Sequence, residues 1–232
     1  MTRANRAVSA FLAVSFAAVA TWASAPKAPP APPGDTAFES FWHDGKAELS
    51  GYRYTVTRYG QIRRGQCVAI YVTEPFSESK RVKVDDSAKN PADTFDALKL
   101  NLVRDFQTGI YDYNTMVSTL VRSANFEPVK VSFTSAEWCG HVYEELVFRP
   151  EGVSGRVLSY FENESSAGDV EHPKGGVAED NLLILLRGLR GDYLKPGGRR
   201  RVPFLTSAFH RRLTHAPLRW SSAEIERLPG AL

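Results

Sequence analysis

Hydrophobic and polar residues alternate over most of the chain, which is the pattern of a β-strand with one buried and one solvent-facing side. The run YRYTVT at residues 52–57 shows it, and the run LKLNL at residues 98–102 repeats it. Such runs recur at intervals of roughly 8 to 14 residues and are separated by glycine- and proline-containing turns, not by helical segments. The chain is therefore predicted to be mainly β, with antiparallel strands.

The longest alternating run is VKVSFTSAEWCGHVYEELVFR, at residues 129–149. Its hydrophobic residues fall on odd positions as far as Phe133 and on even positions from Ala136 onward. We interpret the run as one long central strand whose side-chain register shifts near Ser135.

One segment follows a helical period instead, with an apolar stripe formed by Leu182, Leu185, Leu186 and Leu189. This spacing predicts a helix over about residues 178–190, packed against the sheet. Near the start, Phe38, Phe41 and Trp42 predict a short amphipathic turn that covers the end of the sheet. Strand-like residues resume over 202–213, and residues 81–84 are interpreted as an edge strand or an ordered loop. The predicted architecture is a curved antiparallel sheet or an incomplete β-barrel with one packed helix.

The first residues have the pattern of a secretory signal peptide. Arg3 and Arg6 precede an uncharged run at 7–20, and small residues follow at 23–25. We predict a signal peptide at 1–25, a proline-rich linker at 26–37 and a single β-rich domain at 38–232. The mature protein would be periplasmic or secreted. No other run is long enough to span a bilayer, so no integral membrane span is expected in it.

The 232 residues are 43% hydrophobic and 24% charged, which is typical of a globular domain. Export permits a disulfide bond between the two cysteines, Cys67 and Cys139, and this is the reading that we favour. The alternative is that each is a separate small core residue, because sequence alone does not bring their Cα atoms together. A catalytic thiol is disfavoured outside the cytoplasm.

The strongest charge feature is the basic segment, Lys195–Arg219, which carries seven positive charges and no acidic residue. As a binding surface it would contact anionic groups of the envelope, such as lipid head groups, through Lys195, Arg199, Arg200, Arg201, Arg211 and Arg212. The alternative is a solvated strand face followed by a basic loop. Nucleic acid is not expected as a partner of an exported protein.

Few residues suggest catalysis. His141 with Glu144 and Glu145 superficially resembles a zinc site, but the spacing of a zinc-protease motif is absent. His43 and Asp44 are adjacent without a third partner, and His210 and His215 stand alone. We predict no catalytic residue, no metal ligand and no cofactor.

The aromatic residues could line an apolar cavity in a cup-shaped sheet or fill its core. The residues concerned are Tyr52, Tyr54, Tyr71, Phe106, Tyr111, Tyr113, Trp138, Tyr143, Tyr160 and Phe161. The sequence leaves both readings open, and a filled core is the one that we favour.

Three stretches resemble a family of uncharacterised exported bacterial proteins, some of which are labelled "septum formation inhibitor Maf". They begin FWHDGKAELSGYRYTVTRYG, LKLNLVRDFQTGIYDY and SAEWCGHVYEEL, and the resemblance covers residues 39–220. The Tyr-x-Tyr strand with the following glycine turn is also similar to β-rich envelope domains of the DUF3108 type. Relatives continue beyond HRRLTHAPLRW, so the resemblance implies that this chain is truncated at its C-terminus and exposes a sheet edge.

These features predict a non-catalytic module that binds an apolar or lipid-like component of the cell envelope. One alternative is a periplasmic hydrolase acting on envelope material, which requires two of His43, Asp44 and His141 to converge in a pocket. Another is a structural partner in envelope assembly. The sequence does not indicate an oligomeric state.

Overall fold

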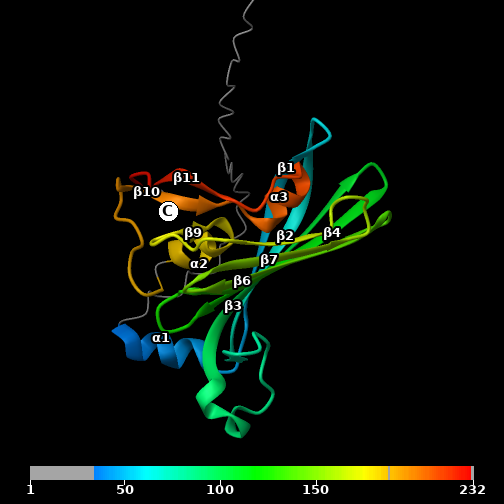
Figure 1. Cartoon of the computed structure of the whole chain (residues 1–232). Helices are drawn as coiled ribbons and strands as arrows, with labels where there is room; N and C mark the ends of the chain where they lie inside the picture. The colour runs from blue at the N-terminus through cyan, green and yellow to red at the C-terminus, as the bar shows by residue number, and fades with distance from the viewer. Residues whose placement is uncertain (1–33, 188, 231–232) are drawn as a thin grey trace, which may run out of the picture.

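The computed structural model describes residues 34–187 and 189–230. Eight strands form one antiparallel sheet in which the order in space follows the order in the chain (Figure 1). They are β1 Glu48–Arg58, β2 Gln61–Ser77, β3 Thr94–Thr108, β4 Tyr111–Arg122, β5 Pro128–Glu137, β6 Gly140–Arg149, β7 Gly152–Ser159 and β8 Ser166–Val170. The sheet is strongly curved and does not close into a barrel, which confirms the predicted fold class.

A second, three-stranded sheet has the order β11-β10-β9. Its strands are β9 Val177–Ala178, β10 Arg199–Leu205 and β11 Trp220–Glu226. The helices are α1 Gly34–Trp42, α2 Leu182–Leu186 and α3 Ala208–Thr214, with single 3₁₀ turns η1 Ser87–Lys89, η2 Pro91–Asp93 and η3 Glu179–Asn181. In Figure 1, α1 lies at the lower left, beside the lower part of the large sheet, whereas α3 lies beside β1 and β2.

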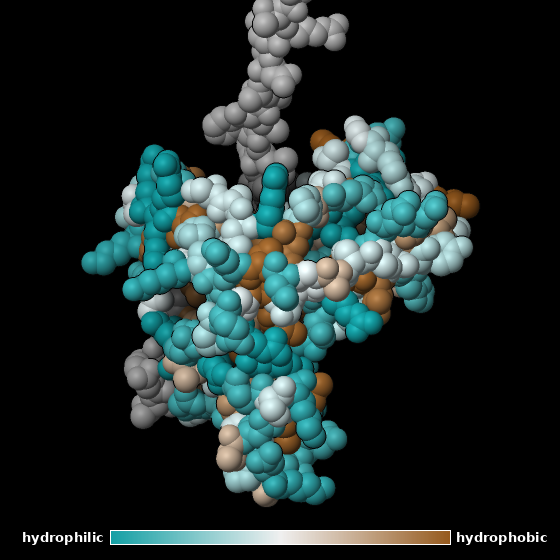
Figure 2. All heavy atoms as spheres, in the orientation of Figure 1, coloured by the Kyte–Doolittle hydropathy of each residue, from teal (hydrophilic) through white to brown (hydrophobic). Residues whose placement is uncertain are grey.

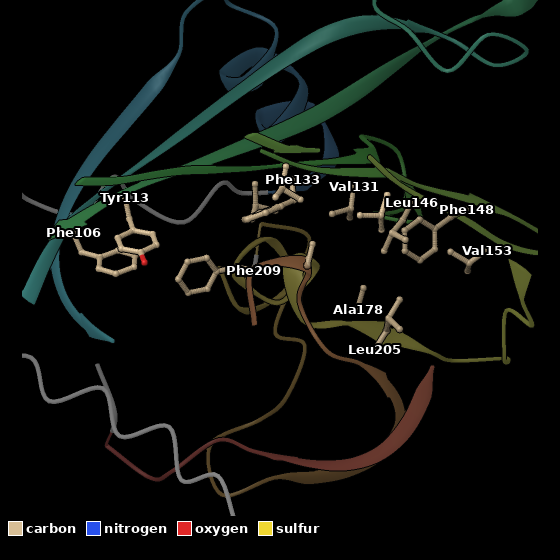
Figure 3. Packing of buried hydrophobic residues seen from close by; sticks show 14 residues of the cluster. Phe106, Tyr113, Val131, Phe133, Leu146, Phe148, Val153, Ala178, Leu205 and Phe209 are labelled. Carbon is tan, nitrogen blue, oxygen red and sulfur yellow. The ribbon is translucent and has the colours of Figure 1, made fainter. Parts of the chain in front are cut away.

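The core lies on one face of the large sheet and has two main parts. Under α1 and α2, Phe38, Trp42 and Ile184 pack against Tyr71 and Leu98. Further along the sheet, side chains from β3 to β7 pack against β9, β10 and α3 (Figure 3). This second part includes Phe106, Tyr113, Phe133, Leu146, Phe148, Leu205 and Phe209.

The run 129–149 is not one strand, and this prediction was wrong. It forms a hairpin of β5 and β6, whose two-residue turn is Trp138-Cys139. In this hairpin Ser135 lies opposite Val142, so residues that face each other have numbers of opposite parity. The core face therefore changes from odd to even positions at the turn, which reproduces the shift that we had attributed to a bulge.

The helical segments also differ from the prediction. α1 begins at Gly34, inside the range assigned to the linker. The helix expected at 178–190 is only η3 followed by α2. The predicted apolar stripe was also wrong, because α2 buries Ile184, which lies outside that stripe, and leaves Leu186 exposed. Strand β10 ends at Leu205, and α3 follows because the Ser207 side chain accepts a hydrogen bond from the His210 N–H as an N-cap. A short apolar run fits both periods, so periodicity could not separate β10 from α3. Residues 81–84 form an ordered loop with one bridge to β2.

Candidate interaction surface

The most unusual feature of the surface is a group of exposed apolar side chains at one end of the large sheet. Because the sheet is a simple meander, the turns after β1, β3 and β5 lie at the same end as the last residues of β7. Five large side chains there, which we call the tip rim, are 65–83% exposed: Tyr59, Ile62, Ile110, Trp138 and Tyr160. Figure 2 shows hydrophobic side chains protruding at the right-hand ends of the strands.

Tight turns hold these side chains away from the core. β1 and β2 are joined by Tyr59-Gly60, and both residues have positive φ, 54° and 69°, as the right-handed twist of a two-residue hairpin favours. β3 and β4 are joined by Gly109-Ile110, where Gly109 has a φ of 67°. Loops of two residues are too short for their side chains to fold back onto the sheet. The exposure of Tyr59 and Ile110 therefore follows from local backbone geometry, whereas Ile62 is exposed because it faces outward from β2.

Aromatic contacts fix the position of the tip rim. The ring of Tyr111 lies 5.6 Å from that of Trp138 and 5.1 Å from that of Tyr113. The hydroxyl groups of Tyr59 and Tyr113 lie 3.1 Å apart, at hydrogen-bond distance. Trp138 and Tyr59 thus rest on a packed aromatic layer, which preorganises this part of the rim.

The ring of Tyr160 lies directly over Gly140, at the start of β6. A Cβ atom at this position would be 2.3 Å from the Tyr160 Cδ1 atom, and the φ of 157° also favours glycine. Gly140 therefore allows the end of β7 to join the rim.

The β1–β2 hairpin adds positive charge to this end of the sheet. Residues 49–73 contain Arg53, Arg58, Arg63 and Arg64 and no acidic residue. Arg58 donates a hydrogen bond to the Leu213 carbonyl at 3.1 Å and lies 4.5 Å above the ring of Tyr59. Sequence reasoning overlooked these arginines because they are spread over two strands.

The structure divides the predicted basic segment into two parts. Lys195, Arg199, Arg200 and Arg201 are exposed on the loop before β10 and on β10 itself. Arg199 is held by two acids of the neighbouring strand β11, at 2.9 Å from Glu226 and 3.8 Å from Glu224. This part is a mixed-charge surface.

The other two predicted ligand-binding residues point inward. Arg211 is 1% exposed and donates hydrogen bonds to the Glu144 carboxylate and to the Thr206 carbonyl. The Arg212 Nε lies 2.8 Å from the other Glu144 oxygen. Glu144 is itself buried, on the core face of β6. Arg211 and Arg212 thus clamp α3 onto the sheet, because a buried carboxylate requires cationic partners.

Two further acids hold the start of α3. Burial raises the pKa of Asp180 to about 6, although its carboxylate accepts the Ala208 N–H at 3.1 Å. Burial acts in the same direction on Glu179, but its ion pair with His210, at 2.8 Å, lowers the pKa of Glu179 below its usual value. These contacts place His210 in a structural cluster.

The two cysteines are free, in place of the disulfide bond that we favoured. Cys67 faces the core from β2, where burial raises the pKa of its thiol. Cys139 is exposed in the β5–β6 turn, beyond the end of the core. Only Cys67 agrees with the alternative reading of a small core residue.

The remaining histidine candidates do not meet. His43 follows α1 and lies 3.4 Å from Asp96 at the start of β3. His141 lies at the opposite end of the sheet, opposite Ala136 on β5. Glu144 and Glu145 face opposite sides of β6, and Glu145 pairs with Lys130. Among the described residues, no group of three or more His, Cys, Asp or Glu side chains is placed to hold a metal ion.

The predicted aromatic set is divided between core and solvent. Phe106 and Tyr113 stack in the core with ring centres 4.5 Å apart. Tyr52, Trp138 and Tyr160 are exposed. Two open grooves, of about 380 and 520 Å³, lie near the tip rim on β5–β7 and on β2–β4. The aromatic residues thus mainly fill the core and form the rim.

Comparison with known proteins adds no further assignment: the chain matches no protein-family profile, no curated protein and no solved structure. Within the described residues, none of the helices is long and apolar enough to cross a membrane.

Proposed function

We propose that this chain is a non-catalytic binding module that attaches to an apolar or lipid-like component of the cell envelope through the tip rim. The observation that carries the proposal is the gathering of Tyr59, Ile62, Ile110, Trp138 and Tyr160 at one end of a rigid sheet. Single exposed apolar residues are ordinary, but a group of large ones on preorganised turns is typical of an interaction surface.

The energy available from the rim suits reversible attachment. Moving one exposed isoleucine or tryptophan side chain from water into an apolar environment contributes about 1.5–3 kcal/mol. Insertion of three such side chains would therefore contribute about 6 kcal/mol, which corresponds to an affinity between millimolar and micromolar. The Tyr59 and Trp138 side chains are held by aromatic contacts before binding, so the loss of their conformational entropy on binding is small.

The geometry gives less support to the hydrolase alternative. That function required two of His43, Asp44 and His141 to converge in a pocket, and His141 lies at the opposite end of the sheet from the other two. His43 and Asp44 are both exposed, and Asp44 pairs with Lys46 at 3.6 Å. The proposed location in the periplasm or outside the cell rests on the sequence at 1–25, which lies outside the described residues.

Sedimentation of the mature chain with phospholipid vesicles tests the proposal. Ile110→Ser removes the most exposed rim side chain, and Leu228→Ser is the matched control because Leu228 is also exposed but lies after β11. We expect Ile110→Ser to weaken vesicle binding about tenfold, since about 1.4 kcal/mol of transfer energy is lost. Leu228→Ser should bind as the unaltered chain does.

Thiol labelling provides a second measurement on the same samples. Cys139 is exposed beside Trp138 in the rim, whereas Cys67 is buried and serves as an internal reference. Vesicles should slow the alkylation of Cys139 and leave that of Cys67 unchanged. Failure to bind any vesicle would overturn the proposal and favour a structural partner in envelope assembly, which a pull-down would then identify.

A further inference from the structure

The four turns and strand ends that carry the tip rim differ in charge. The β1–β2 hairpin has four arginines and no acid between residues 49 and 73. The β3–β4 hairpin carries Asp105 and Asp112 near its tip, and Glu137 immediately precedes the β5–β6 turn. The β1–β2 tip is therefore the basic end of the rim.

The four arginines surround the β1–β2 tip on both faces of the sheet. Arg53 and Arg64 lie on the outer face, since Arg53 is opposite Gln66 and Arg64 is opposite Thr55. Arg58 and Arg63 lie on the core-facing side, since they alternate with the outer residues along their strands. Guanidinium groups thus lie on both faces of the hairpin, further from its tip than Tyr59.

These arginines retain their capacity to bind an anion. In the part of the chain that the structure describes, none of the four forms an ion pair with an acidic side chain. The Arg63 Nε is buried and has no hydrogen-bond partner in the described structure, and the same holds for the Arg58 Nε. These buried atoms lie out of reach of an external anion, whereas the side chains of Arg53 and Arg64 are exposed and can pair with phosphate oxygens.

The order of these residues along the hairpin matches the layers of a lipid surface. Tyrosine and isoleucine at the tip suit the boundary between head groups and acyl chains. Arginines a short distance behind them can keep their charge at the phosphate level while their stems cover apolar surface. We infer that the β1–β2 hairpin is the part of the molecule that first enters a bilayer bearing anionic head groups, with Tyr59 and Ile62 inserted and Arg63 and Arg64 at the level of the phosphates.

This inference rests on the proposed function and adds the class of partner. The acidic residues near the other tips would be repelled by the same surface, so the molecule would dock tilted, with the β1–β2 hairpin deepest. An uncharged bilayer would still bind the rim, but more weakly.

Vesicles of phosphatidylcholine, with and without added phosphatidylglycerol, separate the two proposals. The double variant Arg63→Gln/Arg64→Gln removes two charges from the β1–β2 hairpin, and Arg200→Gln/Arg201→Gln removes two exposed charges from β10 as the matched control. At low salt we expect the Arg63→Gln/Arg64→Gln variant to bind anionic vesicles about thirtyfold more weakly and neutral vesicles with unchanged affinity. The β10 variant should remain within about twofold of the unaltered chain.

Three results would overturn the inference: equal loss in both variants, no preference for anionic vesicles, or a preference that does not fall as salt is raised. Each of them leaves the proposed function standing if neutral vesicles still bind. Circular dichroism of both variants excludes a folding defect as the cause.

Discussion

Two arginine-rich regions of this protein differ in what their charges contact. The basic segment Lys195–Arg219 has the higher density of arginines in the sequence. However, Arg211 and Arg212 form ion pairs with the buried Glu144, and Arg199 forms ion pairs with acidic residues of β11. The four arginines of the β1–β2 hairpin are spread over two strands, and no acid of the described structure pairs with them. The comparison shows that charge density along a chain does not measure the charge offered to a partner.

The largest effect should come from Arg211. Arg211→Met leaves the buried Glu144 carboxylate with only Arg212, so we expect the free energy of unfolding to fall by about 3 kcal/mol in urea titrations. Arg201→Met, a substitution at an exposed position on β10, should change the free energy of unfolding by less than about 0.5 kcal/mol. Equal effects of the two changes would mean that Arg211 is not a structural residue. The double variant Glu144→Leu/Arg211→Met should recover much of the loss, since no buried charge is then left unpaired.

A pH dependence should identify the acids that hold α3. The pKa of Asp180 is raised to about 6 in the folded protein, above its value of 3.8 in the unfolded chain. The folded state therefore binds this proton more tightly than the unfolded chain does. Protonated Asp180 contributes to the free energy of unfolding below pH 4, and this contribution is lost as the pH rises through 6. Glu179 acts oppositely: its pKa is lowered, so its contribution is present above pH 4.5 and is lost on acidification.

Asp180→Asn isolates the first of these two effects. Asparagine cannot ionise, so the stability of the variant relative to the unaltered chain should rise between pH 4 and pH 7, by roughly 2 kcal/mol. Unfolding curves at the two pH values measure the difference. A relative stability that is the same at both would contradict the raised pKa.

A smaller effect is expected where the basic segment is exposed. Arg199→Ala removes a surface pair with Glu226 and should lower the free energy of unfolding by less than about 1 kcal/mol. The loss should disappear at high salt, unlike that of Arg211→Met. If salt left it unchanged, Arg199 would contribute by packing.

The smallest effect on stability should come from the hairpin. Arg63→Gln/Arg64→Gln removes no ion pair of the described structure, so the free energy of unfolding should change by less than about 0.5 kcal/mol. The affinity for anionic vesicles should nevertheless fall. A large loss of stability would show that these arginines serve the fold and would weaken their assignment to lipid.

The sequence by itself determined the β class, most strand positions and the segment near Ile184 that becomes helical. These depend on the period of side chains along the backbone, which is a local property. The turn at Trp138-Cys139 was not predicted. Buried positions change from odd to even numbers both at a β-bulge and across a hairpin turn, so the pattern could not distinguish the two.

Only the tertiary structure decided which charges and apolar residues are available. Arg211 meets Glu144 across 67 residues of chain, and the five rim residues come from four separate turns and strand ends. The meander brings those ends together, because antiparallel pairing returns every second turn to the same edge of the sheet. Pairing between distant segments cannot be read from the local spacing of residues. The basic segment could therefore be predicted from the sequence, but the basic tip of the β1–β2 hairpin could not.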